Sequence, residues 1–446
     1  MRSLLIALLV AAPVFAGNLR QEYARHFLDP KAHLRLSKEL VADGDRLTAF
    51  DIAEAARRGY FGDEVFNSAF REVFLGDHFD NSADAEKRIA AEVARVPGDP
   101  KKRLRLADIY ISRQEWKRAE GELRKAIVLA PDNFEYVGVL SAVLQHDGRE
   151  REGEQAQTAW VDKHPDAVES FRVRAQALAS GESSQAAQVV DAGLAKYPDD
   201  SALHIARAEV LRGRGDIASA AKEYSKAAQL APKWAFAQGA AARFFLKVAH
   251  DDERALSYYL DTYFLDPQYY DGEFAESRIR TLVHERARAR RGTDTIAARL
   301  ADDDSAVVGL AMEEAEQNWS DDFVRPLIAL LHRLDPDVRY SAADLLARHA
   351  RGRIGDEVVK ALSDDDLLAR SAAAYAVGPL AGERFVPVMV SWLSDPAELL
   401  QYDAISILIT SGGNAGRAAL QKLQKERTVK HALLRKMIEK ALAGDH

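Results

Sequence analysis

The sequence of 446 residues contains no cysteine. This absence excludes disulfide bonds, thiol catalysis, covalent haem attachment and zinc sites with cysteine ligands. The twelve histidines are scattered, and no His-Glu-x-x-His pair, phosphate-binding loop or Gly-x-Ser-x-Gly elbow occurs. The formal net charge of −8 gives no bulk attraction to nucleic acid. We therefore expect no enzyme activity, no cofactor, no metal site and no nucleic-acid partner.

The first 16 residues are the only stretch that resembles a targeting segment. Arg2 is followed by an apolar run from Leu4 to Val14 and by a small-residue cleavage site at Val14-Phe15-Ala16. This pattern predicts a secretory signal, although a buried first helix is the alternative. No cysteine follows the cleavage site, so we expect no lipid anchor. We also expect no transmembrane segment in the rest of the chain, and an exported protein, periplasmic or extracellular, that is soluble after signal cleavage.

A series of prolines recurs through the middle of the chain. The steps between successive members are 34, 34, 33, 34 and 35 residues. A constant period of this length is typical of stacked helical repeats, because two helices and two short turns fill it and proline ends the second helix. The members are Pro97, Pro131, Pro165, Pro198, Pro232 and Pro267.

Small residues lie at helical spacing before these prolines. Ala119, Leu123 and Ala126 precede Pro131, and Asp132-Asn133 follows it as a cap for the next helix. The pattern resembles the tetratricopeptide repeat, whose two antiparallel helices meet where small residues allow close approach. Equivalent positions before the other prolines hold Ala85, Ala186, Val190, Ala220, Tyr224, Ala227, Ala255 and Tyr259.

One unit departs from this pattern. Gly153, Gln157 and Trp160 stand where the unit ending at Pro165 should have its small and medium residues. We expect this unit to be irregular, or its stacking to be looser.

A second period begins after about residue 293. Alanines recur at 31-residue steps, and acidic loops precede them at the same step. The segment from Leu334 to Arg339 resembles the loop between short HEAT-like repeats. We expect its aspartates to cap the next helix, and Arg339 to reach a carboxylate of a neighbouring loop. The recurring residues are Ala311, Ala342, Ala373 and Ala404, with Asp304, Asp335 and Asp366 before them and Arg370 matching Arg339.

The two periods together predict an all-α fold, an α/α superhelix in which a right-handed tetratricopeptide solenoid is followed by a HEAT-like solenoid. The expected segments are a signal peptide (1–16), a helical region with degenerate tetratricopeptide-like units (17–97), the tetratricopeptide array (98–267), a capping or linker helix (268–292) and the HEAT-like domain (293–446).

Polar side chains on the first helix of each tetratricopeptide unit are the candidate partner-binding residues. Long polar and charged side chains in such a groove suit an extended peptide or a chain terminus, although the signs are mixed and a merely hydrated groove is the alternative. The candidates are Lys101, Asp108, Glu135, Gln145, Arg172, Gln176, Glu209, Arg212 and Arg243.

Two further stretches lie at the junction of the arrays. Arginines crowd residues 278–291 around His284, and they either meet an anionic partner or form a solvated helix paired with Glu276 and Glu285. Aromatic residues crowd 258–274 and either form core or a docking surface; we expect Tyr269 and Tyr270 to be the most exposed.

The sequence thus favours a non-enzymatic protein–protein interaction scaffold of the cell envelope that binds its partners along the inner face of the solenoid. An assembly or maturation factor for envelope or secreted complexes is the alternative. A carboxylate-pair enzyme on the groove is a third hypothesis, for which no placed acid–base pair is evident.

Overall fold

The computed structural model describes residues 20–76, 82–178, 183–270, 273–290, 294–349 and 360–443. These residues form helices joined by short loops and no strand; one isolated bridge joins Tyr270 and Phe274. The predicted all-α class is confirmed. The expected signal segment 1–16 lies outside the described residues.

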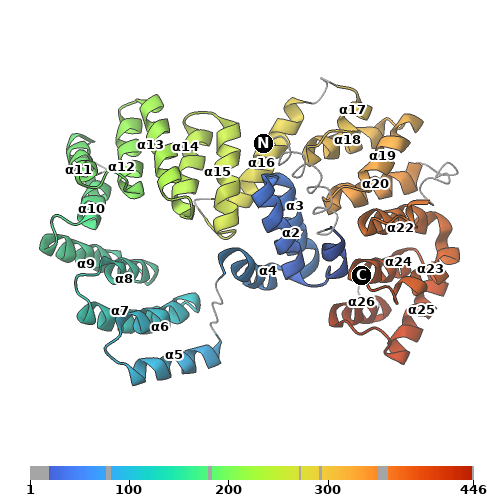
Figure 1. Cartoon of the computed structure of the whole chain (residues 1–446), viewed down its shortest axis with the longest axis horizontal. Helices are drawn as coiled ribbons and strands as arrows, with labels where there is room; N and C mark the ends of the chain where they lie inside the picture. Colours follow the sequence, from blue (N-terminus) through green and yellow to red (C-terminus); the bar gives the residue numbers. More distant parts are fainter. Residues whose placement is uncertain are drawn as a thin grey trace, which may run out of the picture. The chain divides into compact units, whose positions relative to one another are not determined.

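The chain divides into two compact units (Figure 1). We call Asp77–Glu276 the central unit, and Met1–Gly76 together with Ser277–His446 the terminal unit. This grouping differs from the expected order of segments, in which residues 17–97 formed one region next to the tetratricopeptide array.

The central unit consists of consecutive helices that pack as neighbouring pairs, α6 with α7, α8 with α9, and so on to α14 with α15. The helices are α5 (Ala83–Arg95), α6 (Pro100–Ser112), α7 (Trp116–Leu129), α8 (Phe134–His146), α9 (Glu150–Lys163), α10 (Val168–Leu178), α11 (Ser183–Lys196), α12 (Ser201–Gly213), α13 (Ile217–Leu230), α14 (Ala235–Lys247) and α15 (Asp252–Leu265).

The residues that predicted these pairs also form their contacts. Ala119, Leu123 and Ala126 of α7 are fully buried, because their small or medium side chains let α7 approach α6. Asn133 caps α8 by accepting the backbone N–H of Glu135 at 2.9 Å. Each pair is therefore built from local signals that recur along the sequence.

The unit ending at Pro165 is close-packed at its unusual position. Gly153 of α9 is buried, and a Cβ added there would lie 2.7 Å from the Oγ of Ser141 in α8. The glycine permits a closer approach of two helices than any larger residue would. The two helices within this unit are close together, but α9 packs less extensively against α10 than the second helices of the other units pack against their successors, so the predicted looser stacking is seen between this unit and the next.

The terminal unit combines helices from both ends of the chain (Figure 1). The N-terminal elements are α2 (Pro30–Asp43), α3 (Arg46–Ala55), the π-helical turn η1 (Ala56–Phe61), α4 (Asp63–Phe70) and the π-helical turn η2 (Arg71–Leu75). The C-terminal elements are α16 (Ala275–Ala289), α17 (Ile296–Leu300), α18 (Ser305–Gln317), η3 (Asp321–Phe323), α19 (Val324–Leu330), α20 (Pro336–His349), α22 (Leu367–Ala381), η4 (Gly382–Phe385), α23 (Val386–Trp392), α24 (Glu398–Thr410), α25 (Gly413–Glu426) and α26 (Ala432–Ala443).

The acidic loops of the second period cap helices as predicted. Asp304 accepts the backbone N–H of Ala306, and Asp366 accepts that of Leu368. The arginine prediction is wrong in its partner: Arg339 donates to the carbonyl oxygens of Arg333 and Leu334 at 2.8 and 2.6 Å, in the loop just before its own helix. Arg339 stabilises the loop before its own helix, because the start of that helix brings the carbonyl groups of Arg333 and Leu334 within hydrogen-bonding distance of the guanidinium.

The N-terminal helices are held to the C-terminal repeats by a shared apolar core. Tyr23 and Phe27 pack in one cluster with Leu368 of α22 and Ile405 of α24. At the edge of this core, Arg20 forms an ion pair with Asp366 at 2.5 Å. Residues 20–76 therefore complete the hydrophobic core of the terminal unit.

Candidate binding surfaces

The predicted partner-binding residues all lie on the first helix of a pair, and none is fully buried. Lys101, Glu135, Gln145, Gln176 and Arg212 are exposed, and Asp108, Arg172, Glu209 and Arg243 are half-buried. They are distributed over α6, α8, α10, α12 and α14. The structure thus places them on equivalent elements of successive pairs.

Three of these residues meet around one tyrosine. Glu209 of α12 accepts hydrogen bonds from Arg212, at 2.6 Å, and from the hydroxyl of Tyr224 in α13. Burial and the hydrogen bond to Glu209 raise the pKa of Tyr224, while the positive charges of Arg212 and Arg243 oppose that rise. The cluster links α12, α13 and α14, and it leaves Arg212 exposed.

Arg172 is engaged in a contact between neighbouring pairs. Its Nε donates to Asp200, the residue that caps α12, at 3.0 Å, and this hydrogen bond raises the pKa of the guanidinium. By contrast, the side chains of Gln145 and Gln176 form no hydrogen bond or ion pair with any residue that the structure describes. The two glutamines are therefore available to a partner, while Arg172 first stabilises the array.

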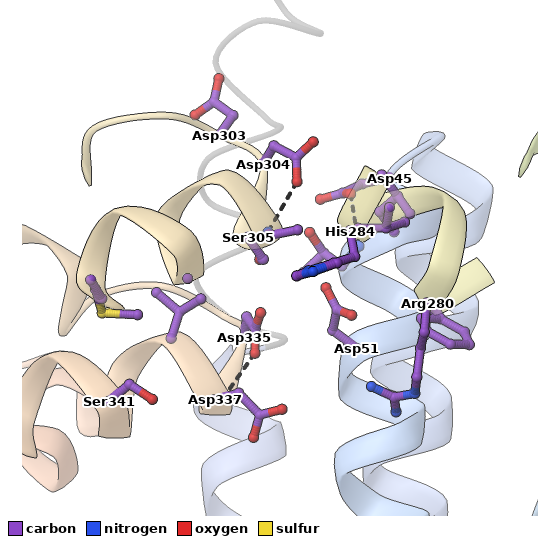
Figure 2. A pocket seen from close by; sticks show the side chains of 18 of the residues that line it. Asp45, Asp51, Arg280, His284, Asp303, Asp304, Ser305, Asp335, Asp337 and Ser341 are labelled. Carbon is purple, nitrogen blue, oxygen red and sulfur yellow. Dashed lines mark hydrogen bonds between the residues drawn. The ribbon is translucent and has the colours of Figure 1, made fainter. Parts of the chain in front are cut away.

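An acidic cavity of about 760 Å³ in the terminal unit was not foreseen from the sequence. Figure 2 shows the carboxyl groups of Asp51, Asp304 and Asp335 around the same space, with the ring of His284 of α16 among them. Burial, followed by the negative charge of Asp335, raises the pKa of Asp51 well above its usual range. The positions of Asp304 and Asp335 in the sequence are each explained by the start of a helix. The proximity of Asp51 to these two residues depends on the fold.

The described residues contain no group of histidine, aspartate or glutamate side chains arranged to hold a metal ion. Several carboxylates of the acidic cavity already accept hydrogen bonds from helix N-termini, as Asp45 does from the N–H of Thr48.

The arginines at the junction have partners on other elements. Arg280 pairs with Glu54 of α3 at 3.2 Å, and Arg286 pairs with Asp304 at 2.6 Å. The sequence had left open either an anionic partner or pairing with Glu276 and Glu285 of the same helix. The basic stretch thus joins α16 to its neighbours in the terminal unit. Arg291 lies outside the described residues.

The aromatic stretch near α15 is mostly core. Tyr263 and Phe264 are buried, and the half-buried ring of Tyr269 lies against Gly239, where an added Cβ would be 2.6 Å away. Tyr270 is 63% exposed. Of the two tyrosines that we expected to be most exposed, only Tyr270 lies in water.

In the described part of the chain, none of the helices has the length and apolar character that crossing a bilayer requires.

The sequence profile of HEAT repeats matches residues 324–409. Comparison with curated proteins gives no match. Among solved structures, the chain is similar to a tetratricopeptide repeat protein from Parabacteroides merdae, with 14% identity, 57% of this chain and 98% of that chain covered, and a TM-score of 0.36.

Two further solved structures are similar at the same level. The human IFIT1 dimer with PPP-AAAA shares 14% identity, with 77% of this chain and 92% of that chain covered and a TM-score of 0.33. The tetratricopeptide domain of P58(IPK) shares 16% identity, with 93% and 98% covered and a TM-score of 0.24. Similarities this distant say nothing about ligands or partners.

The helix pairs of the central unit, the 31-residue repeats of the terminal unit and the profile match agree with one another. The chain is a helical-repeat protein that combines tetratricopeptide-like pairs with HEAT-like repeats, a fold typical of protein–protein interaction scaffolds.

Proposed function

We propose that this protein is a non-enzymatic scaffold of the cell envelope that binds an extended segment of a protein partner along the first-helix face of its central unit. The observation that carries this proposal is the placement of exposed polar side chains on α6, α8, α10 and α12, and of the half-buried Arg243 on α14, one first helix after another. Repeat arrays present such equivalent helices as one extended binding surface.

The chemistry of this face suits a peptide backbone. Gln145 and Gln176 offer amide donors and acceptors that no described residue occupies, and each can pair with a peptide group of the partner. Arg212 pairs with Glu209 through Nε and Nη2, and the remaining Nη1 of its exposed guanidinium can meet a carboxylate of the partner. The expected signal segment 1–16 supports export, and hence an envelope partner.

Site-specific photo-crosslinking tests the proposal. A photo-reactive amino acid replaces Gln145 or Gln176, and the tagged full-length protein is expressed in the organism from which it comes. After irradiation, the crosslinked proteins are identified by mass spectrometry. We expect one dominant partner to be trapped from both positions.

The matched controls are Gln155 on α9 and Gln188 on α11, which are exposed glutamines on the second helices. These positions should trap little or none of the same partner. Equal trapping from first and second helices would refute a binding face on the first helices, and many unrelated partners would instead favour an assembly factor.

A further inference from the structure

A cavity of about 780 Å³ lies at the C-terminal end of the HEAT-like repeats. Helices α25 and α26, the last two in Figure 1, contribute its walls together with the loop between them. Its volume is within the range of about 300–1,000 Å³ that is usual for ligand pockets. This cavity is separate from the first-helix face of the central unit and shares no residue with it.

The lining of this cavity combines cationic and apolar side chains. Arg427, Lys430 and Arg435 supply positive charge, while Leu423 and Ile438 supply apolar surface. We call this feature the basic cavity. Such a lining suits a ligand that joins an anionic group to an apolar one.

Positive charge is concentrated in this part of the chain. Residues 422–440 contain seven lysines and arginines against two glutamates, although the whole chain has a net charge of −8. The cations are Lys422, Lys425, Arg427, Lys430, Arg435, Lys436 and Lys440. The local charge therefore opposes the sign of the rest of the protein.

Arg427 occupies a backbone conformation that another residue would adopt more easily. It ends α25 with φ of 53°, in the left-handed region where helices usually end with glycine or asparagine. The conformation alone marks no site, because Gln114 and His250 share it. At Arg427, however, it coincides with a cavity that two further cations line, although glycine would adopt this backbone at a lower cost.

The cationic side chains of the basic cavity differ in the hydrogen bonds that they form within the protein. Arg435 donates to the carbonyl oxygens of Val429 and Lys430 and thereby holds the loop between the helices. The side chains of Arg427 and Lys430 form no hydrogen bond or ion pair within the described residues. A fixed loop thus presents two uncommitted positive groups beside apolar side chains.

We propose that the basic cavity binds the C-terminal carboxylate of a protein partner whose last side chain is apolar. The guanidinium of Arg427 can take a carboxylate in a bidentate fork, Lys430 adds a second charge, and Leu423 and Ile438 receive the apolar side chain. Cationic groups beside apolar side chains favour a chain end, which joins a carboxylate to a side chain, over a purely anionic surface. This proposal rests on the scaffold function above and adds a second, distinct partner site.

Fluorescence anisotropy of labelled peptides tests this inference with the full-length protein. The probe is a peptide of sequence Gly-Ser-Gly-Ala-Leu with a dye at its N-terminus and a free C-terminal carboxylate, and its counterpart has a C-terminal amide. We expect the carboxylate form to bind about tenfold more tightly than the amide, because only the carboxylate carries a negative charge and offers two acceptor oxygens to the guanidinium.

Arg427→Gly is the decisive variant. It removes the guanidinium and places at φ of 53° the residue that best adopts it, so the melting temperature should stay or rise while affinity for the carboxylate probe falls about tenfold. The matched control is Lys436→Ala, which removes an exposed cation of α26 outside the lining and should change affinity by less than about twofold.

Glu439 gives a test in the opposite direction. Its carboxylate also lines the basic cavity and should repel the anionic end of the peptide. Glu439→Gln is therefore expected to tighten binding of the carboxylate probe by about twofold to fivefold. A gain of affinity cannot result from misfolding.

Three outcomes would overturn the proposal. The first is equal binding of the carboxylate and amide probes, and the second is unchanged binding by the Arg427→Gly variant. The third is Arg427-dependent binding to vesicles of one part phosphatidylglycerol and three parts phosphatidylcholine without binding of the peptide, which would assign the cavity to a lipid headgroup. None of these results affects crosslinking from Gln145 and Gln176, so failure here is distinguishable from failure of the scaffold function.

Discussion

Replacing Asp403 with asparagine should remove a large pH dependence from the stability of the terminal unit. Asp403 is fully buried in α24 and accepts hydrogen bonds from the hydroxyls of Ser371, Tyr375 at 3.2 Å and Tyr340 at 3.4 Å. Burial raises the pKa of its carboxyl from the ordinary 3.8 to about 7, against the opposing effect of these hydroxyls and of Arg339.

The sign of the effect follows from proton binding. Because the folded state holds the proton more tightly than the unfolded chain, the free energy of unfolding falls as pH rises from about 4 to about 7 and then levels off. At about 1.4 kcal/mol per pKa unit, the difference between 3.8 and about 7 sets an upper bound of roughly 4 kcal/mol on this loss.

The other ionisable groups packed around Asp403 do not titrate in the window from pH 5 to pH 8. Burial raises the pKa values of the Tyr340, Tyr375 and Tyr402 phenols above 10, and Arg339 remains charged with a raised pKa. The difference between the parent protein and the Asp403→Asn variant therefore isolates Asp403.

Urea unfolding at pH 5, 6, 7 and 8 measures this difference, and hydrogen exchange of α22 and α24 assigns it to the terminal unit. We expect the curve of the parent protein to lose stability across this range, while the curve of the variant falls less steeply, because Asp51 also has a raised pKa and is still present, and lies above the parent curve at pH 8. Parallel curves for the two proteins would mean that the carboxyl does not change its protonation here, and the argument from burial would be refuted.

Two further predictions concern packing. Gly153→Ala should destabilise the central unit by about 1–3 kcal/mol, since its Cβ would lie 2.7 Å from the Oγ of Ser141. The control, Gly121→Ala in α7, meets no atom within 4 Å and should stabilise the unit by up to about 1 kcal/mol. Equal shifts of the melting temperature in the two variants would contradict this prediction. Phe27→Ala should lower the free energy of unfolding of the terminal unit by about 3–5 kcal/mol, because the ring is fully buried and its centroid lies 5.4 Å from that of Tyr402. Hydrogen exchange should then rise in α24 as well as in α2. A rise confined to α2 would show that the N-terminal helices do not support the repeats.

The sequence predicted the features that depend on residues close together in the chain. Proline spacing and small residues such as Ala119 indicated helix pairs, and the 31-residue step indicated the capping role of Asp304 and Asp366, which is confirmed. The hydrogen-bond partner of Arg339 was predicted wrongly, because a carboxylate is in general the stronger acceptor for a guanidinium. In the structure, the guanidinium instead donates to the carbonyl oxygens of the residues six and five positions before it. The local geometry of the loop thus decided the partner, and the strength of the acceptor did not.

Contacts between the two ends of the chain could not be predicted in the same way. Arg20 and Asp366 are 346 residues apart, and Leu28 donates its N–H to Glu398, 370 residues away, at 2.9 Å. A repeat period describes how each unit meets the next, and it contains no information about which distant helix covers the last exposed face.

The candidate cavities follow the same division. The acidic cavity needs Asp51 from one end of the chain and Asp335 from the other, so no local pattern could reveal it. The basic cavity is local, between residues 423 and 439, and its signal was present in the sequence as a cluster of cations on the terminal pair of helices. Charge in a terminal repeat is ordinarily explained by solvation of the open end. The fold adds that α25, α26 and the loop between them line a cavity there, which places Arg427 and Lys430 beside Leu423 and Ile438. Solvation accounts for the charge alone, whereas a ligand with an anionic and an apolar part uses both kinds of side chain.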